Sequence, residues 1–112
     1  MNNEAAEKLL FWMVFVLPTL MVFTALPMIL EIVPPNGAIG VRTAVSLSSE
    51  EAWYAINFRA GVAIAISSVL SIILSLGLMK YLNKTKTQKS LYALVSFGIL
   101  FMISLSVEDQ AY

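Results

Sequence analysis

The sequence predicts an all-α integral membrane protein with three transmembrane helices and a structured polar extracytoplasmic loop between the first two. Of its 112 residues, 59% are hydrophobic and only 12% are charged, whereas an ordinary globular protein carries about 25% charged residues. Three runs contain no charged residue, at 9–30, 60–79 and 91–107. As helices they would be about 33, 30 and 25 Å long, against a hydrocarbon core of about 30 Å. We therefore expect one three-span domain covering residues 1–112.

The first span contains Pro18 and Pro27, and proline inside a membrane helix predicts a bend. A signal peptide is the alternative interpretation of an apolar run near the N-terminus. A signal's apolar region is about 7 to 15 residues long and ends at small residues, whereas this run is longer and leads into Glu31 and two prolines. We expect it to remain attached.

The second span is expected to continue a helix that starts above the membrane. Ser48 and Glu51 fit a capping box, in which the serine hydroxyl accepts from the backbone N–H of Glu51 and the glutamate side chain reaches back. This pattern predicts a helix from about residue 49 through residue 79. Trp53 and Tyr54 would then lie in the membrane interface, where amphipathic rings are favoured.

The basic residues predict the orientation in the membrane. Four lysines lie between the second and third spans and Lys8 precedes the first, whereas only Arg42 and Arg59 lie in the 31–59 loop. Basic residues favour the cytoplasmic side. We expect a multi-pass protein of the plasma membrane with a cytoplasmic N-terminus, an external 31–59 loop and an extracytoplasmic C-terminus.

Composition also excludes several functions. The chain has no cysteine and no histidine, and seven basic residues balance seven acidic ones. Thiol and imidazole chemistry is therefore absent, and a serine nucleophile would need a lysine base, yet every lysine lies outside the spans. We expect no enzyme activity, no catalytic residue, no cofactor, no metal site and no nucleic-acid partner.

Two further features have both a structural and a functional interpretation. Ser67, Ser71 and Ser75 recur every four residues; we favour close helix packing over a polar conduit. The lysine-rich segment 80–89 is typical of a solvated turn near anionic lipid, and docking of a cytosolic partner is the alternative. Small residues in the second and third helices also permit a homo-oligomer.

The segment from Pro34 to Gly61 is longer and more polar than a connection needs. Pro35 and Asn36 belong to a Pro-Pro-Asn-Gly turn, in which Asn-Gly tolerates positive φ. Gly40 permits a further unusual backbone conformation. A second group lies on the following helix. Trp53, Asn57 and Gly61 are spaced four apart and therefore share one face of it. Glu50 lies approximately on the same face, and Arg59 lies on a different face.

Together, these residues resemble the SdpI-like (SdpI/YfhL) family of bacterial membrane immunity proteins. The matching positions are a proline-asparagine turn, a G-x-R-T element and a following tryptophan, asparagine and glycine: Pro35, Asn36, Gly40, Arg42, Thr43, Trp53, Asn57 and Gly61. In the family a basic residue often follows the asparagine, but here Phe58 does and Arg59 comes next. The resemblance implies protection against a secreted antimicrobial peptide, with signalling to a cytosolic partner in the founding system. A small transporter or channel component, or an oligomeric structural protein, is the alternative.

Two roles for Arg42 remain open from the sequence. It could pair with Glu31, Glu50 or Glu51 and fold the loop onto the helix ends. Alternatively, a surface made of Arg42, Trp53, Asn57 and Arg59 could capture a peptide toxin or its terminal carboxylate. The two roles are compatible with each other.

Overall fold

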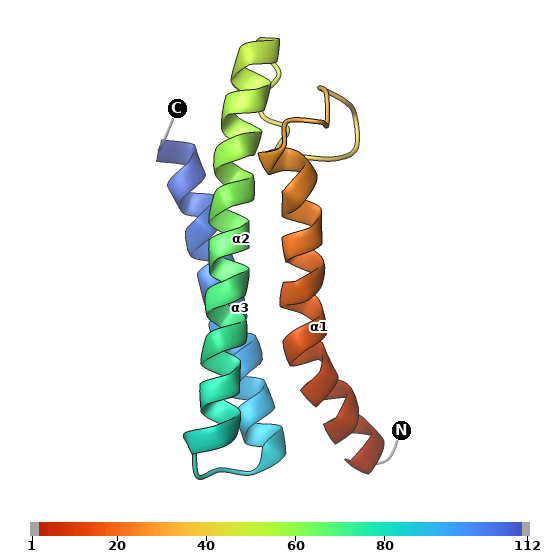
Figure 1. The fold of residues 1–112 in the computed structure, drawn as a ribbon, viewed down its shortest axis with the longest axis vertical. Helices are drawn as coiled ribbons and strands as arrows, with labels where there is room; N and C mark the ends of the chain where they lie inside the picture. Colours follow the sequence, from red (N-terminus) through yellow and green to blue (C-terminus); the bar gives the residue numbers. More distant parts are fainter. Residues whose placement is uncertain (1–2, 111–112) are drawn as a thin grey trace.

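A computed structural model describes residues 3–110, and the side chains within it up to residue 104. Three helices follow one another: α1 (Asn3–Ile29), α2 (Glu50–Tyr81) and α3 (Lys86–Gln110) (Figure 1). Each is long and apolar enough to cross a membrane, which confirms the predicted fold class. The C-terminus, which is expected to be extracytoplasmic, ends at Tyr112 and lies outside the described residues.

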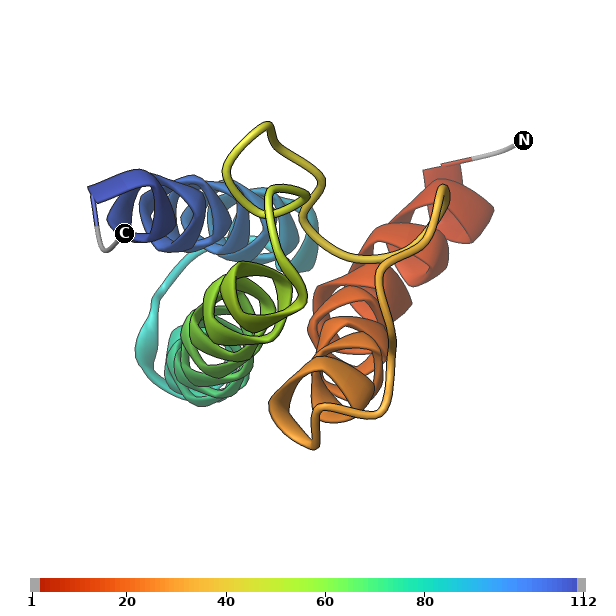
Figure 2. The same ribbon diagram turned by 90° about the horizontal axis from the view of Figure 1, so that it is seen from above.

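Helix α2 is the centre of the bundle. It packs against both α1 and α3, which contact each other less (Figure 2). The interior contains many small side chains. The serines expected to pack at four-residue spacing are buried there (Ser67, Ser71 and Ser75), where small residues let neighbouring helices approach closely.

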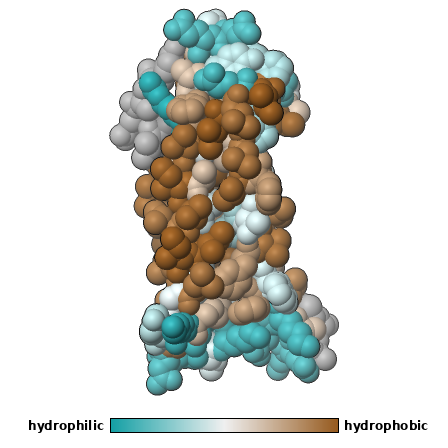
Figure 3. All heavy atoms as spheres, viewed as in Figure 1, coloured by the Kyte–Doolittle hydropathy of each residue, from teal (hydrophilic) through white to brown (hydrophobic). Residues whose placement is uncertain are grey.

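The outer surface of the bundle is apolar. Trp12, Phe23, Ile73 and Ile99 are among many large apolar side chains that the protein itself leaves exposed. Figure 3 shows a brown, apolar band between two teal, polar ends. An apolar surface of this extent requires lipid around it, because water would disfavour it strongly.

Helix α1 is continuous through both prolines, yet its N-terminal turns incline away from the rest of the helix (Figure 1). Pro18 lacks an N–H and its ring crowds the carbonyl of Val14, which accounts for the bend. The helix ends in a Schellman motif: the N–H of Ile32 donates to Pro27 O over 3.2 Å and that of Glu31 to Met28 O over 3.3 Å. Glu31 has φ of 56°, a position usually taken by glycine.

Helices α2 and α3 begin at residues other than those predicted. The N-cap of α2 is Ser49, whose Oγ accepts from Ala52 N over 3.0 Å, and not Ser48. Ser48 still belongs to the preceding turn, because its hydroxyl donates to Val45 O over 2.6 Å.

Helix α3 begins several residues before the apolar run at 91–107. Thr85 and Gln88 form a capping box, each side chain accepting from the other's backbone N–H over 3.2 Å. The Thr-x-x-Gln pattern was present in the sequence and would have predicted this start.

Candidate functional site: the cap over the first two helices

Residues 31–49, called the cap below, connect α1 to α2 and fold against the first turns of α2 (Figure 1). Asn36 closes the first turn of the cap. Its Nδ2 donates to Pro34 O (2.8 Å) and Ile39 O (3.1 Å), and its Oδ1 accepts from Ala38 N (2.8 Å) and Ile39 N (2.7 Å). The turn is therefore held by the asparagine side chain, with Pro34 and Pro35 restricting the chain that enters it.

Positive φ occurs at only one of the two places considered from the sequence, which were the Asn-Gly turn and Gly40. Among the described residues it is found at Glu31 and Gly40, not at Asn36 or Gly37. The side-chain bonds of Asn36 close the turn without it. Gly40, by contrast, has φ of 98°, so the unusual conformation predicted there is present.

Gly40 is where the cap meets α2. A Cβ at this position would lie 2.7 Å from Asn57 Oδ1 and 3.1 Å from Cζ2 of Trp53. Both the positive φ and this close approach exclude a larger side chain. A glycine at position 40 thus has a physical cause, because its backbone packs directly on the helix face that carries Trp53 and Asn57.

Asn57 binds the backbone of Val41, the residue that follows Gly40. Its Oδ1 accepts from Val41 N over 2.6 Å, while its Nδ2 donates to Trp53 O over 3.0 Å and reaches Val41 O at a longer 3.4 Å. Only 3% of Asn57 is exposed. A buried carboxamide can satisfy one N–H and one C=O at once, which explains an asparagine at this position.

Trp53 fixes the start of the cap. Its ring is fully buried and its Nε1 donates to Val33 O over 2.8 Å. The expected depth of Trp53 in the membrane interface stays a prediction, but its ring lies under the cap and its N–H already has a protein partner. For the same reason Trp53 and Asn57 do not form an outward-facing surface with Arg42 and Arg59.

A single helical turn completes the cap. Thr43 and Ser46 cap it reciprocally: Thr43 N donates to Ser46 Oγ (2.8 Å) and Ser46 N donates to Thr43 Oγ1 (3.0 Å). The Ser46 hydroxyl also donates to Val41 O over 2.9 Å, and Ser46 is fully buried. Ser46 was not predicted from the sequence, although Thr-x-x-Ser places two hydroxyls where each can accept from the other's backbone N–H. Val33 and Val41 were not predicted either, because they contribute only backbone atoms and leave no sequence signal.

Gly61 lies below the cap and joins α2 to α1. A Cβ there would lie 2.9 Å from Ile29 Cγ1 and 3.1 Å from both Ala25 O and Met28 Cβ. The two helices therefore touch at the level where α1 ends, and a larger residue would separate them.

The remaining motif residues are exposed: Pro35, Arg42, Glu50 and Arg59. The Nε of Arg42 donates to Asn36 O over 2.9 Å. Among the side chains that the structure describes, Arg42 forms no ion pair with Glu31, Glu50 or Glu51, so the expected pairing is wrong. The partner of the Arg42 guanidinium is the backbone carbonyl of Asn36 and not a carboxylate.

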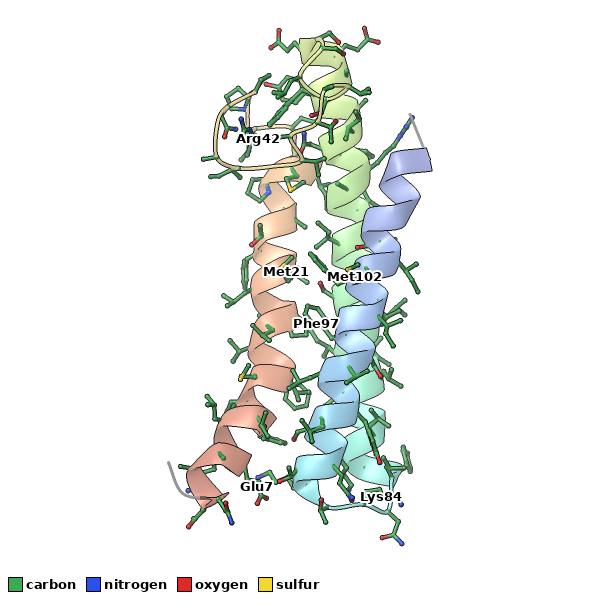
Figure 4. The ribbon with its side chains drawn as sticks, turned by 180° about the vertical axis from the view of Figure 1, so that it is seen from behind. Glu7, Met21, Arg42, Lys84, Phe97 and Met102 are labelled. Carbon is green, nitrogen blue, oxygen red and sulfur yellow. The ribbon has the colours of Figure 1, made fainter. Side chains whose placement is uncertain are left out.

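The opposite end of the bundle carries five lysines, called the lysine end (Lys8, Lys80, Lys84, Lys86 and Lys89). Figure 4 places Arg42 at the cap and Glu7 and Lys84 at this other end. Lys86 Nζ lies 4.4 Å from the centre of the Phe11 ring, and Lys89 Nζ donates to Met79 O over 2.9 Å. These contacts tie α3 to the ends of α1 and α2.

Comparisons with known proteins bear on the same segment. The SdpI/YfhL protein family matches residues 32–107, which include most of the cap, all of α2 and most of α3. No curated protein and no solved structure matches the chain. The family match covers more than half of the chain and contains every motif residue on which the resemblance was based. This multi-pass membrane protein therefore belongs to the SdpI/YfhL protein family.

Proposed function

We propose that this chain protects a bacterium against a secreted, membrane-active peptide by binding the peptide at its cap, without chemistry. The supporting observation is the state of Arg42. Its Nε is held by Asn36 O, while the side chain is exposed on the folded cap. A guanidinium that is held in place loses little conformational freedom when it binds.

The proposal places the cap outside the cell. The lysine end holds five of the seven basic residues, and Arg42 and Arg59 lie on the cap side. Basic residues are retained on the cytoplasmic side. An alkaline phosphatase reporter joined after Tyr112 is expected to be active, because three spans carry the C-terminus to the cap side. An inactive reporter would reverse the orientation and remove the peptide's access to Arg42.

Arg42 has the chemistry for a carboxylate. With Nε bonded to the cap, the two terminal NH₂ groups of the guanidinium remain to donate. A guanidinium pairs with a carboxylate through two parallel hydrogen bonds. The terminal carboxylate of a peptide, or an acidic side chain in it, fits this donor set. Matched peptides with a free acid or an amide at the C-terminus distinguish these two carboxylates.

The test is protection of a peptide-sensitive bacterium that expresses the chain and is challenged with purified membrane-active peptide toxins. For a toxin against which the chain protects, Arg42→Ala is expected to lower the inhibitory concentration about tenfold or more, since a hydrogen bond to a charged group contributes about 1.5 to 3 kcal/mol. Arg42→Lys keeps the positive charge but not the two parallel NH₂ donors, so the variant should protect only partly.

Lys84→Ala is the matched control, because it removes one exposed positive charge from the far end of the bundle. It should protect like the unmodified chain. Membrane levels of every variant are measured by immunoblot. Full protection by Arg42→Ala, or a loss that follows the amount of protein in the membrane, would contradict the proposal.

A further inference from the structure

The cap combines its dense hydrogen bonding with exposed aliphatic side chains. Ile32 is 66% exposed, Ile39 56%, Val45 49% and Leu47 47%. Single exposed aliphatic residues are ordinary on a protein surface. Here they continue a larger surface: in Figure 3 the brown atoms of the central band extend up one side of the otherwise teal upper end.

The dimensions of the molecule limit how far the cap projects from a bilayer. The bundle is 49 Å long, and a bilayer with its headgroup layers is about 40 to 45 Å thick. The apolar run at 9–30 would be about 33 Å long as a helix and matches a hydrocarbon core of about 30 Å. The end of α1 therefore lies near the hydrocarbon boundary, and the cap begins in the headgroup layer.

Contacts with the helices order the cap residues by height. Ile32 is lowest, because its N–H bonds to Pro27 O in the last turn of α1. Ile39 is next, since it precedes Gly40, which packs on Asn57, about 6 Å along α2 from Gly61 at a rise of 1.5 Å per residue. Val45 is highest of the three: its carbonyl accepts from Ser48, beside the start of α2.

We propose that the cap is seated in the headgroup layer of its own leaflet, with Ile32 and Ile39 inserted among the first carbons of the lipid chains. Val45 lies at the aqueous edge of this layer. The occupant of the apolar side is lipid, because these side chains extend the surface that lipid already covers on the helices. This inference holds in either orientation of the chain and does not depend on the proposed function.

The chain contains no cysteine, so single-cysteine variants can be labelled with an environment-sensitive fluorophore without background. Ile32→Cys, Ile39→Cys and Val45→Cys are compared in lipid nanodiscs with Glu51→Cys, an exposed position in the first turn of α2. All four replace exposed side chains, and circular dichroism checks that the helices are retained. Each label is exposed separately to aqueous iodide and to phospholipid carrying a nitroxide quencher near the headgroup.

Lipid-borne quenching should decrease, and iodide quenching increase, in the order Ile32, Ile39, Val45, Glu51. A label at Ile39 that iodide quenches as strongly as one at Glu51 would overturn the proposal. A label at Ile39 that neither reagent reaches would also overturn it, in favour of a protein partner. Recovery of quenching when protein is diluted in lipid would identify that partner as a second copy of the chain.

Discussion

At the cap, polar side chains bind backbone atoms of their own chain, whereas at the lysine end most of the charge faces outward. Asn36, Thr43 and Asn57 each bond to backbone groups in or beside the cap. In contrast, Lys80 and Lys84 are exposed. The difference teaches that a polar motif in a membrane protein can be mainly architecture, with its polar side chains bound to the backbone of the same chain.

The largest effect is expected at Trp53. Trp53→Ala removes a fully buried ring and its hydrogen bond to Val33 O, so the free energy of unfolding should fall by about 3 to 5 kcal/mol. Reversible unfolding in detergent micelles measures this. Trp12 provides the control, because it is 62% exposed, and Trp12→Ala should change stability far less. Equal losses in the two variants would show that burial of Trp53 under the cap adds nothing to stability.

A smaller effect is expected at Gly40. Gly40→Ala introduces a Cβ 2.7 Å from Asn57 Oδ1 at a φ of 98°, and backbone strain of this kind costs about 1 to 3 kcal/mol. Gly37→Ala is the matched control in the same segment, since a Cβ there would have nothing within 4 Å. The same unfolding assay compares them. If Gly37→Ala were the more damaging change, the assignment of Gly40 as the contact point between cap and α2 would be wrong.

The sequence predicted the helices better than it predicted the use of the motif. Apolar runs specify membrane helices because lipid permits few alternatives to a helix, and the shared face of Trp53, Asn57 and Gly61 follows from helical spacing alone. All three lie on the buried side of α2. The direction of that face, toward the cap and α1, could not be derived from spacing, which is why a binding surface was expected there.

The hydrogen-bond partners within the cap were beyond prediction for another reason. Arg42 was expected to pair with a carboxylate, yet its Nε donates to the backbone carbonyl of Asn36. Backbone partners such as Val33 and Val41 leave no residue-type signal in a single sequence. The capping side chains Ser46, Thr85 and Gln88 did leave one, in the patterns Thr-x-x-Ser and Thr-x-x-Gln.

The smallest effect is expected at the lysine end. Lys86→Ala removes the cation–π contact with Phe11, and such contacts contribute about 0.5 to 1 kcal/mol at exposed sites. A double-mutant cycle with Phe11→Leu isolates the contact from other effects of each change. A coupling energy in that range would show that this end is also fastened by a specific contact, though far more weakly than the cap. Zero coupling would mean that the contact between Lys86 and Phe11 adds no stability, and the contrast with Trp53 would become sharper.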